Sequence, residues 1–322
     1  LLTLFFPTLI IRTSQQIHKT IQYEMTMRIL IVNKFLYLRG GDCVHSLNLK
    51  QLLRNAGHDV CFYAMSYSQN IVCEENKYFA EEISFSAKDL QGKIKAASRI
   101  IWGIGVVQNF KKLLEEFQPD VVHLNNIHSY LSPIVAKLAY QRGVKVIWTL
   151  HDYKLICPSY SCLCKGNTCE ACFTDKKHVV LRKCMKNSFP ASILAWGEAM
   201  NWNKNKLSLW TNSFICPSQF MAEKMQQGGY PASKLQVISN FIGEEQVQYI
   251  INTPNPIREE AYAYIGRLSQ EKGVESLLKA ASRLPYKLYI AGSGPLEADL
   301  KKKYTANNII FLGHLGIMDT IE

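Results

Sequence analysis

Apolar positions along the chain follow two alternating patterns. Short runs of consecutive apolar, often β-branched residues, such as Val144-Lys145-Val146-Ile147-Trp148, predict strands buried on both faces. Between them, spacings such as that of Leu49, Leu52, Leu53 and Ala56 predict amphipathic helices. The predicted strands are 28–33, 59–64, 120–124, 144–149, 213–216, 235–239, 261–265, 286–291 and 309–312. Strands that alternate with helices predict a doubly wound α/β fold.

The chain length and one loop predict how the domains are divided. A length of 322 residues suggests two domains, and the Pro- and Asn-rich loop at 252–256 marks an interdomain linker at 244–260. We therefore expect an N-terminal Rossmann-like domain at 27–243 and a second at 261–322. The second unit has only three strands and two helices, so we expect it to be incomplete.

The first 26 residues differ from the rest of the chain. Met27 is followed at once by a strand pattern, whereas the largely apolar stretch that opens the chain covers only eleven positions, too few to span a membrane. We therefore interpret residues 1–26 as a non-native or disordered leader. No other apolar run is long enough to predict a membrane span.

Composition and charge narrow the class of protein. Apolar residues make up 48% of the chain and charged residues 20%, which excludes disordered, collagenous and coiled-coil proteins. Lys and Arg outnumber Asp and Glu by 37 to 26. The net charge of +11 favours an anionic partner: a phosphate compound, a nucleic acid or an anionic membrane surface.

Two loops that follow predicted strands have features of phosphate sites. Gly40 and Gly41 open a helix, where free backbone N–H groups favour an anion, although a glycine pair is also typical of a plain turn. Arg267 and Lys272 flank the start of another helix, and their guanidinium and ammonium groups suit a diphosphate. A solvated basic loop is the alternative for the second feature.

Six short motifs occur together from about residue 27 onward, in one order and spacing. The run Gly-Arg-Leu-x-x-Glu-Lys-Gly at 266–273 resembles the signature of glycosyltransferase family 4, the retaining nucleotide-sugar transferases with a GT-B fold. The other five matching segments are 119–128, 149–153, 216–220, 237–241 and 290–295. The resemblance implies two Rossmann-like domains that face each other across a cleft, with the acceptor bound mainly by the first and the donor by the second.

The resemblance also assigns roles to particular residues. Catalytic roles fall on His151 and Asp152, although a histidine at a strand end is also typical of hydrogen-bonded structure. The residues that match the acceptor-side motif are His123, Asn125, Asn126 and His128. The residues that match donor-binding positions are Gly40, Gly41, Asn240, Gly266, Arg267, Lys272, Gly292 and Gly294.

The implied chemistry is transfer of a sugar from a nucleotide-diphosphate sugar, with retention of configuration. Fixed cations stabilise the charge that develops on the leaving phosphate, so no cofactor or catalytic metal is expected. The leaving phosphate assists deprotonation of the acceptor, and no protein nucleophile is assigned. Family members also carry two Glu residues separated by seven positions, which we expect beyond Glu322, so we expect a truncated chain whose own activity is in doubt.

Six of the ten cysteines lie between residues 157 and 184. Cys169 and Cys172 have the two-residue spacing of a metal-binding turn, and His178 and Cys184 complete a Cys3His set for structural zinc. Some bacterial members of the family resemble this chain in carrying a Cys-rich insert after the His-Asp motif. Free thiols, a disulfide and an iron–sulfur centre are the alternatives.

Two segments favour contact with an anionic membrane. The stretch from Gly92 to Trp102 mixes Lys and Arg with bulky apolar residues, and Trp196, Trp202 and Trp210 lie in a later helical stretch. Helices packed on the sheet are the alternative. We expect a cytoplasmic protein at the inner face of the plasma membrane.

The function predicted from sequence is a retaining glycosyltransferase that acts on a glycan or lipid-linked acceptor in cell-surface polysaccharide synthesis. One alternative is a GT-B epimerase that hydrolyses nucleotide sugars. Another is a non-catalytic zinc protein that binds nucleotides or nucleic acid, although the dispersed basic residues argue against nucleic acid as a partner.

Overall fold

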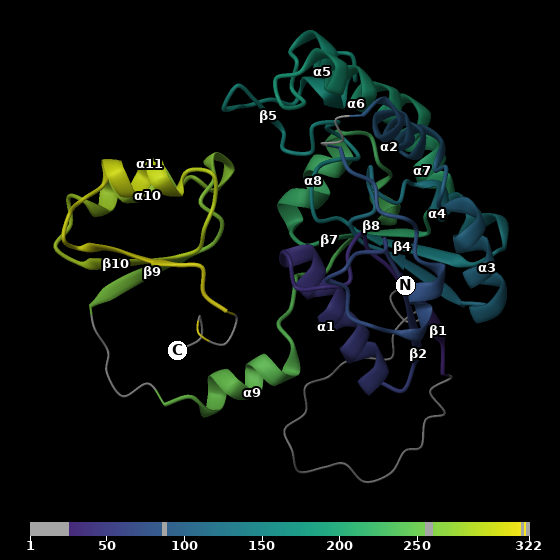
Figure 1. Ribbon diagram of the computed structural model, residues 1–322, viewed down its shortest axis with the longest axis horizontal. Helices are drawn as coiled ribbons and strands as arrows, with labels where there is room; N and C mark the ends of the chain where they lie inside the picture. Colours follow the sequence, from purple (N-terminus) through teal and green to yellow (C-terminus); the bar gives the residue numbers. More distant parts are fainter. Residues whose placement is uncertain (1–25, 86–88, 255–259, 317–318, 320–322) are drawn as a thin grey trace.

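The computed structural model describes residues 26–85, 89–254, 260–316 and 319, which form two α/β lobes (Figure 1). The leader predicted at 1–26 lies outside the described residues apart from Thr26. The first lobe holds a parallel sheet in the order β2-β1-β3-β4-β7-β8. Its strands are β1 (Arg28–Val32), β2 (Asp59–Tyr63), β3 (Val121–Leu124), β4 (Lys145–Thr149), β7 (Ser213–Cys216) and β8 (Leu235–Val237).

Helices cover both faces of this sheet. Leu30, Ile31 and Val32 are consecutive residues of β1 that point to alternate faces, and all three are fully buried. The helices of this lobe are α1 (Gly41–Asn55), α2 (Leu90–Trp102), α3 (Val107–Phe117), α4 (Ile134–Gln141), α5 (His178–Leu181), α6 (Phe189–Asn201), α7 (Lys204–Trp210) and α8 (Gln219–Gln227). The α/β class predicted from the apolar runs is confirmed.

The second lobe holds a smaller parallel sheet in the order β11-β10-β9. Figure 1 shows its two helices together on one side of the strands. Along β9 the side chains alternate between exposed and half-buried, because only one face of the sheet is covered. The elements are β9 (Ala261–Ile265), α10 (Val274–Ala281), β10 (Lys287–Ala291), α11 (Glu297–Lys303) and β11 (Ile309–Gly313).

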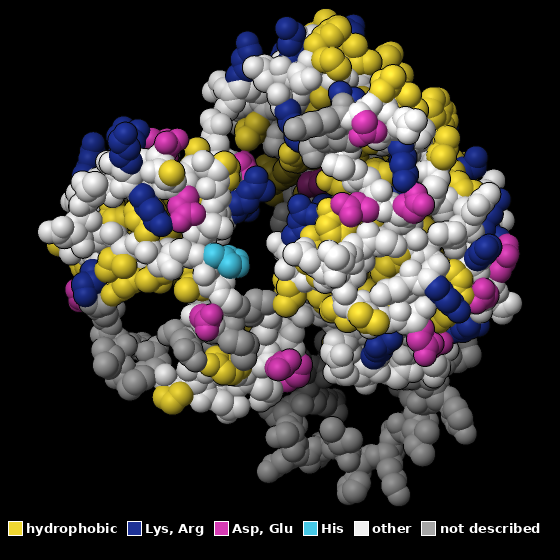
Figure 2. All heavy atoms as spheres, in the orientation of Figure 1, with side chains coloured by type: hydrophobic (Ala, Val, Ile, Leu, Met, Phe, Trp, Pro, Cys, Tyr) yellow, Lys and Arg dark blue, Asp and Glu magenta, His cyan; other side chains and the backbone are white. Residues whose placement is uncertain are grey.

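The expected linker contains a helix, α9 (Glu244–Asn252), which begins beside α1. A Cβ atom on Gly243 would lie 3.1 Å from Oδ1 of Asn48. Figure 2 shows a hollow between the two lobes, with Lys and Arg side chains on both of its sides.

The Cys-rich segment contains a short antiparallel hairpin that the apolar pattern did not predict. Its strands are β5 (Leu163–Cys164) and β6 (Asn167–Thr168). Two residues per strand are too few to produce a recognisable alternation. The hairpin turn meets the second lobe, since a Cβ on Gly166 would lie 2.7 Å from Nε2 of Gln270.

Candidate functional site

In the sheet of the first lobe, the order in which the chain adds strands reverses between β1 and β3. The chain leaves β1 for β2 on one side and later returns to β3 on the other, so a crevice opens at the carboxyl ends of these strands. Asn33 and Lys34 follow β1, Asn125 and Asn126 follow β3, and His151 follows β4. Their backbones are joined, since the N–H of Lys34 donates to the carbonyl of Asn126.

Helix α1 begins at this crevice. Gly40 is its N-cap, in an extended conformation with φ of −167°. The N–H groups of Cys43 and Val44 both donate to the carbonyl of Gly40, so those of Gly41 and Asp42 remain free among the described residues. A side chain on Gly41 would meet nothing within 4 Å. This open helix N-terminus has the geometry of an anion site.

His151 is held by the neighbouring strand. Its Nε2 lies 3.0 Å from Oδ1 of Asn125, a contact that places hydrogen on Nε2 and leaves Nδ1 as an acceptor. The His45 ring, on the first turns of α1, packs edge-on to His151 with centroids 5.1 Å apart. Burial, and after it the nearby His45, lower the pKa of His151 to about 4. The imidazole is therefore neutral at physiological pH and accepts hydrogen bonds.

Three further residues complete the surroundings of His151. The ring of His45 also packs against Phe241 at 5.3 Å, so the segment that crosses to the second lobe contacts α1. Lys34 forms an ion pair with Asp42 at 3.5 Å. His45, Lys34 and Asp42 were not predicted from sequence. The signal for His45 was its position one helical turn after Gly41, on the same side of α1.

The other residues predicted on the acceptor side lie in two different environments. His123 and Asn126 lie at the strands of the sheet, whereas His128 lines a small pocket. His123 is only 8% exposed, and its Nε2 lies 2.8 Å from Oγ1 of Thr149. Burial, followed by the nearby His45 and His151, lowers its pKa to about 3, so His123 supports the site from within the sheet. Asn126 donates its N–H to Oδ1 of Asn33 and so links β1 to β3.

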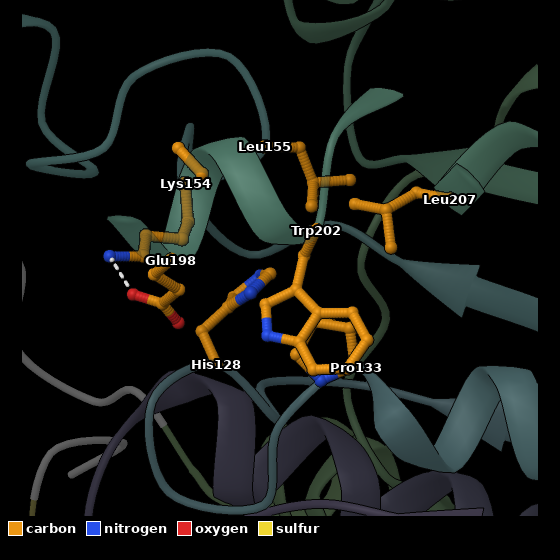
Figure 3. A pocket seen from close by; sticks show the side chains of 8 residues that line it. His128, Pro133, Lys154, Leu155, Glu198, Trp202 and Leu207 are labelled. Atoms are coloured by element: carbon orange, nitrogen blue, oxygen red, sulfur yellow. Dashed lines mark ion pairs between the residues drawn. The ribbon is translucent and has the colours of Figure 1, made fainter. Parts of the chain in front are cut away.

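His128 lines a small pocket of about 20 Å³ (Figure 3). Its ring stacks on Trp148 with centroids 5.3 Å apart. Beside it, the Lys154 ammonium pairs with the Glu198 carboxylate at 2.8 Å, and both side chains are more than nine-tenths buried. A cavity of this size has room for about one water molecule. This ion pair was not predicted from sequence, because it joins a loop after β4 to helix α6.

The Asp152 side chain forms a hydrogen bond within its own loop. Its Oδ1 accepts the N–H of Lys154 at 2.8 Å, and burial raises the pKa of the carboxyl above its ordinary value. This contact orients the loop that carries His151.

The predicted donor loop follows β9 in the second lobe. Arg267 and Lys272 are exposed, and neither side chain forms a hydrogen bond or ion pair with another described residue. Both cations act on Glu271: although burial would raise its pKa, its hydrogen bonds and these two charges hold the pKa below the ordinary value. The two cations therefore lie close to one carboxylate, next to the start of α10.

Gly292 and Gly294 allow the next loop to press against the donor loop. A Cβ on Gly292 would lie 2.0 Å from the carbonyl oxygen of Gly266, and one on Gly294 would lie 2.3 Å from that of Leu268. Gly292 also has φ of 144°, which other residues rarely adopt. The N–H of Leu268 donates to the carbonyl of Ser293 at 2.9 Å. Asn240 is exposed between β8 and α9.

The predicted zinc set is not assembled in the structure. In the part of the chain that the structure describes, no three His, Cys, Asp or Glu side chains are spaced to hold a metal ion. The Cys169 thiol instead accepts from Nη1 of Arg182 at 3.0 Å, and Cys184 lies against Cys164. All ten cysteines are free thiols. The set Cys169, Cys172, His178 and Cys184 stays a prediction that these contacts do not support, since ligand spacing along the chain does not by itself bring the side chains together.

The low pKa values of His123 and His151 predict a loss of stability in mild acid. In the unfolded chain each titrates near its ordinary value of about 6.5. Below that pH, and down to the folded values of about 3 and about 4, the unfolded state binds protons that the folded state does not, so stability falls with pH. Each histidine contributes about 1.4 kcal/mol per pH unit near pH 5.

Urea unfolding between pH 7 and pH 5, followed by tryptophan fluorescence, measures this slope. We expect His123→Gln to reduce the slope by the contribution of one group. An unchanged slope in His123→Gln would contradict the neutral, buried state of His123.

Comparison with known proteins identifies the class. The sequence profile of Glycosyltransferase Family 4 matches residues 39–246, well over half of the chain. The chain therefore belongs to Glycosyltransferase Family 4 and is a glycosyltransferase of the GT-B fold, so the resemblance carried by the sequence motifs is confirmed.

Two relatives are similar to this chain in sequence. An uncharacterized 42.6 kDa protein in the cps region of Klebsiella pneumoniae is 24% identical over 315 residues, which cover 92% of this chain and 76% of that protein. An uncharacterized glycosyltransferase of Methanosarcina acetivorans is 36% identical over 107 residues, 30% of this chain and 28% of the relative.

Solved structures share the fold. Anabaena Alr3699/HepE, crystallised with UDP-glucose, has a TM-score of 0.53 at 14% identity, covering 90% of this chain and 70% of that chain. Sucrose-phosphate synthase from Thermosynechococcus elongatus has a TM-score of 0.55 at 15% identity, covering 90% and 71%.

Proposed function

We propose that this glycosyltransferase transfers a sugar from a nucleotide-diphosphate sugar to a glycan or lipid-linked acceptor, with retention of configuration. The observation that carries the proposal is the donor loop. Two exposed cations, Arg267 and Lys272, have no described side-chain partner, flank the start of α10 and act on the same carboxylate. A diphosphate supplies the missing negative charge, and a guanidinium binds its oxygens in pairs.

In the proposed reaction, the bond between the sugar and the diphosphate breaks and negative charge develops on the leaving phosphate. Arg267, Lys272 and the free N–H groups at the start of α1 stabilise this charge. The leaving phosphate takes the proton of the attacking acceptor hydroxyl. His151, neutral and held by Asn125, accepts a hydrogen bond from the transferred sugar through Nδ1. Asp152 orients its loop.

Two comparisons support the substrate classes. The Anabaena structure of the same fold contains UDP-glucose, a nucleotide sugar. The Klebsiella relative is named for a cps region, which agrees with an acceptor in cell-surface polysaccharide synthesis. We propose that the reaction takes place at the cytoplasmic side of the membrane.

Incubation of the chain with UDP-sugars and GDP-sugars, with and without lipid-linked glycan acceptors, tests the proposed function. We expect release of UDP or GDP that increases when an acceptor is present, and a product that keeps the anomeric configuration of the donor. Release of free sugar at a rate independent of every acceptor would favour a hydrolase. Failure to bind any nucleotide would contradict the proposal.

A further inference from the structure

Helix α6 exposes a continuous apolar stripe. Phe189, Ile193, Trp196 and Met200 are 50%, 43%, 39% and 51% exposed. Their spacing of four, three and four residues places them on one side of the helix. The opposite side buries Ser192, Ala195 and Glu198 in the lobe. The stripe therefore exists in addition to the packing face of α6.

Helix α2 extends this surface. It packs beside α6: Nε1 of Trp202 donates to the carbonyl of Ile100 at 2.8 Å, and a Cβ on Gly197 would lie 3.4 Å from Ile101. Ile94 and Trp102 of α2 are 58% and 62% exposed. We call Ile94, Trp102, Phe189, Ile193, Trp196 and Met200 the α2–α6 face. Figure 2 shows hydrophobic side chains gathered along the upper edge of the first lobe, where Figure 1 places α5, α6 and α2.

The charges on the two helical segments of this face are mostly positive, although Arg99 is buried, Lys95 pairs with Glu81, and Asp89 caps the start of α2. Residues 90–104 contain three Lys or Arg and no Asp or Glu, and residues 181–209 contain five Lys or Arg and one Glu. That Glu is Glu198, which is buried and paired with Lys154. Lys93, Lys183 and Lys186 are exposed. An apolar surface surrounded by cations, without an exposed acid in these two segments, is complementary to anionic lipid headgroups over acyl chains.

The α2–α6 face is connected to the candidate site by an ion pair of helix α6. Glu198 lies on the inward side of the helix and pairs with Lys154, three residues after His151. No helix in the described part of the chain is long and apolar enough to cross a bilayer.

We propose that the α2–α6 face docks on an anionic lipid bilayer. Trp102 and Trp196 enter the headgroup region, where their rings are favoured, while Lys93, Lys183 and Lys186 contact the lipid phosphates. Two of the tryptophans predicted from sequence to contact the membrane do not belong to this face: Trp202 and Trp210 are 8% and 9% exposed and pack against each other.

Co-sedimentation of the full chain with vesicles tests the docking surface. We expect binding to phosphatidylcholine vesicles that contain phosphatidylglycerol, weak binding to phosphatidylcholine alone, and release at high salt. Such vesicles carry no sugar donor or acceptor, so this result is independent of the proposed glycosyl transfer. Equal binding to both vesicle types, or none to either at low salt, would overturn the proposal.

Variants locate the binding to this face. We expect Ile193→Ser to weaken binding about 10-fold, through loss of buried apolar area. Lys183→Gln with Lys186→Gln should weaken it at least about 10-fold. The matched controls are Val72→Ser and Ile251→Ser, which remove exposed apolar side chains elsewhere and should bind as the parent does. If the controls lose as much binding as Ile193→Ser, the α2–α6 face is not the docking surface.

Tryptophan emission gives a second readout. Trp102 and Trp196 are exposed at 62% and 39%, whereas Trp148, Trp202 and Trp210 are buried. We expect anionic vesicles to shift the emission to shorter wavelength, and Trp102→Phe with Trp196→Phe to abolish the shift. Light scattering without lipid tests a second copy of the chain as the occupant: a dimer that Ile193→Ser dissociates would overturn bilayer docking.

Discussion

Replacing Arg267 by alanine is expected to weaken UDP or GDP binding by about 10- to 100-fold. The variant removes a guanidinium that has no described protein partner and is proposed to bind the diphosphate. Charge-assisted hydrogen bonds of this kind contribute about 1.5–3 kcal/mol, which corresponds to that range of affinity. Titration calorimetry with UDP and with GDP, at one fixed ionic strength, measures the change.

Lys272→Ala should have a smaller effect, about 10-fold, because an ammonium acts as a point charge and not as a paired donor. The matched controls are Arg283→Ala and Lys302→Ala, two exposed cations of the same lobe outside the donor loop. They should bind nucleotide as the parent does. Parent-like affinity in the Arg267 variant would contradict the assignment of this loop to the diphosphate.

Replacing Glu198 by alanine is expected to destabilise the first lobe by about 3–5 kcal/mol. The carboxylate pairs with Lys154 at 2.8 Å and accepts the N–H of Ser129 at 3.1 Å. The substitution leaves the Lys154 ammonium buried without its counter-charge, which costs far more than the loss of a surface pair. Urea unfolding followed by tryptophan fluorescence reports this lobe, since all five tryptophans lie between residues 102 and 210.

Two control variants distinguish the destabilisation caused by an unpaired buried charge from a general loss of packing. Lys154→Met combined with Glu198→Leu removes both charges while keeping similar volume, and should recover most of the lost stability. Glu81→Ala breaks the more exposed pair with Lys95 in the same lobe, and should change stability by about 0.5 kcal/mol or less. If the double variant is as unstable as Glu198→Ala, an unpaired charge is not the cause.

The strands and the loops at their ends could be predicted from sequence. The run from Val144 to Trp148 is apolar at consecutive positions because β4 is covered on both faces, so the signal is local. Gly40 and Gly41 were also identified from a local signal, a glycine pair between a strand pattern and a helix pattern, and α1 begins at Gly41. Glycines 292 and 294 were identified by family resemblance, and the structure adds the close approach that requires them.

The surroundings of His151 could not be predicted in this way. His45, His123 and His151 come from α1, β3 and the end of β4, and only the packing of α1 on the sheet places His45 against His151. The pair of Lys154 and Glu198 depends in the same way on where α6 docks. Residue type and spacing give no signal for a contact between elements far apart in the chain.

The sequence alone determined the α/β class, the positions of the parallel strands and the family motifs. Each depends on neighbouring residues, since a strand that is buried on both faces is apolar at consecutive positions. The tertiary structure alone decided which tryptophans are exposed and which cysteines meet. Trp196 and Trp202 lie on one helical stretch, yet Trp202 packs against α2 and Trp196 faces outward. Cys184 lies against Cys164, a contact that the cysteine spacing did not predict, because the packing of a segment with little buried apolar surface is decided by contacts with the rest of the lobe.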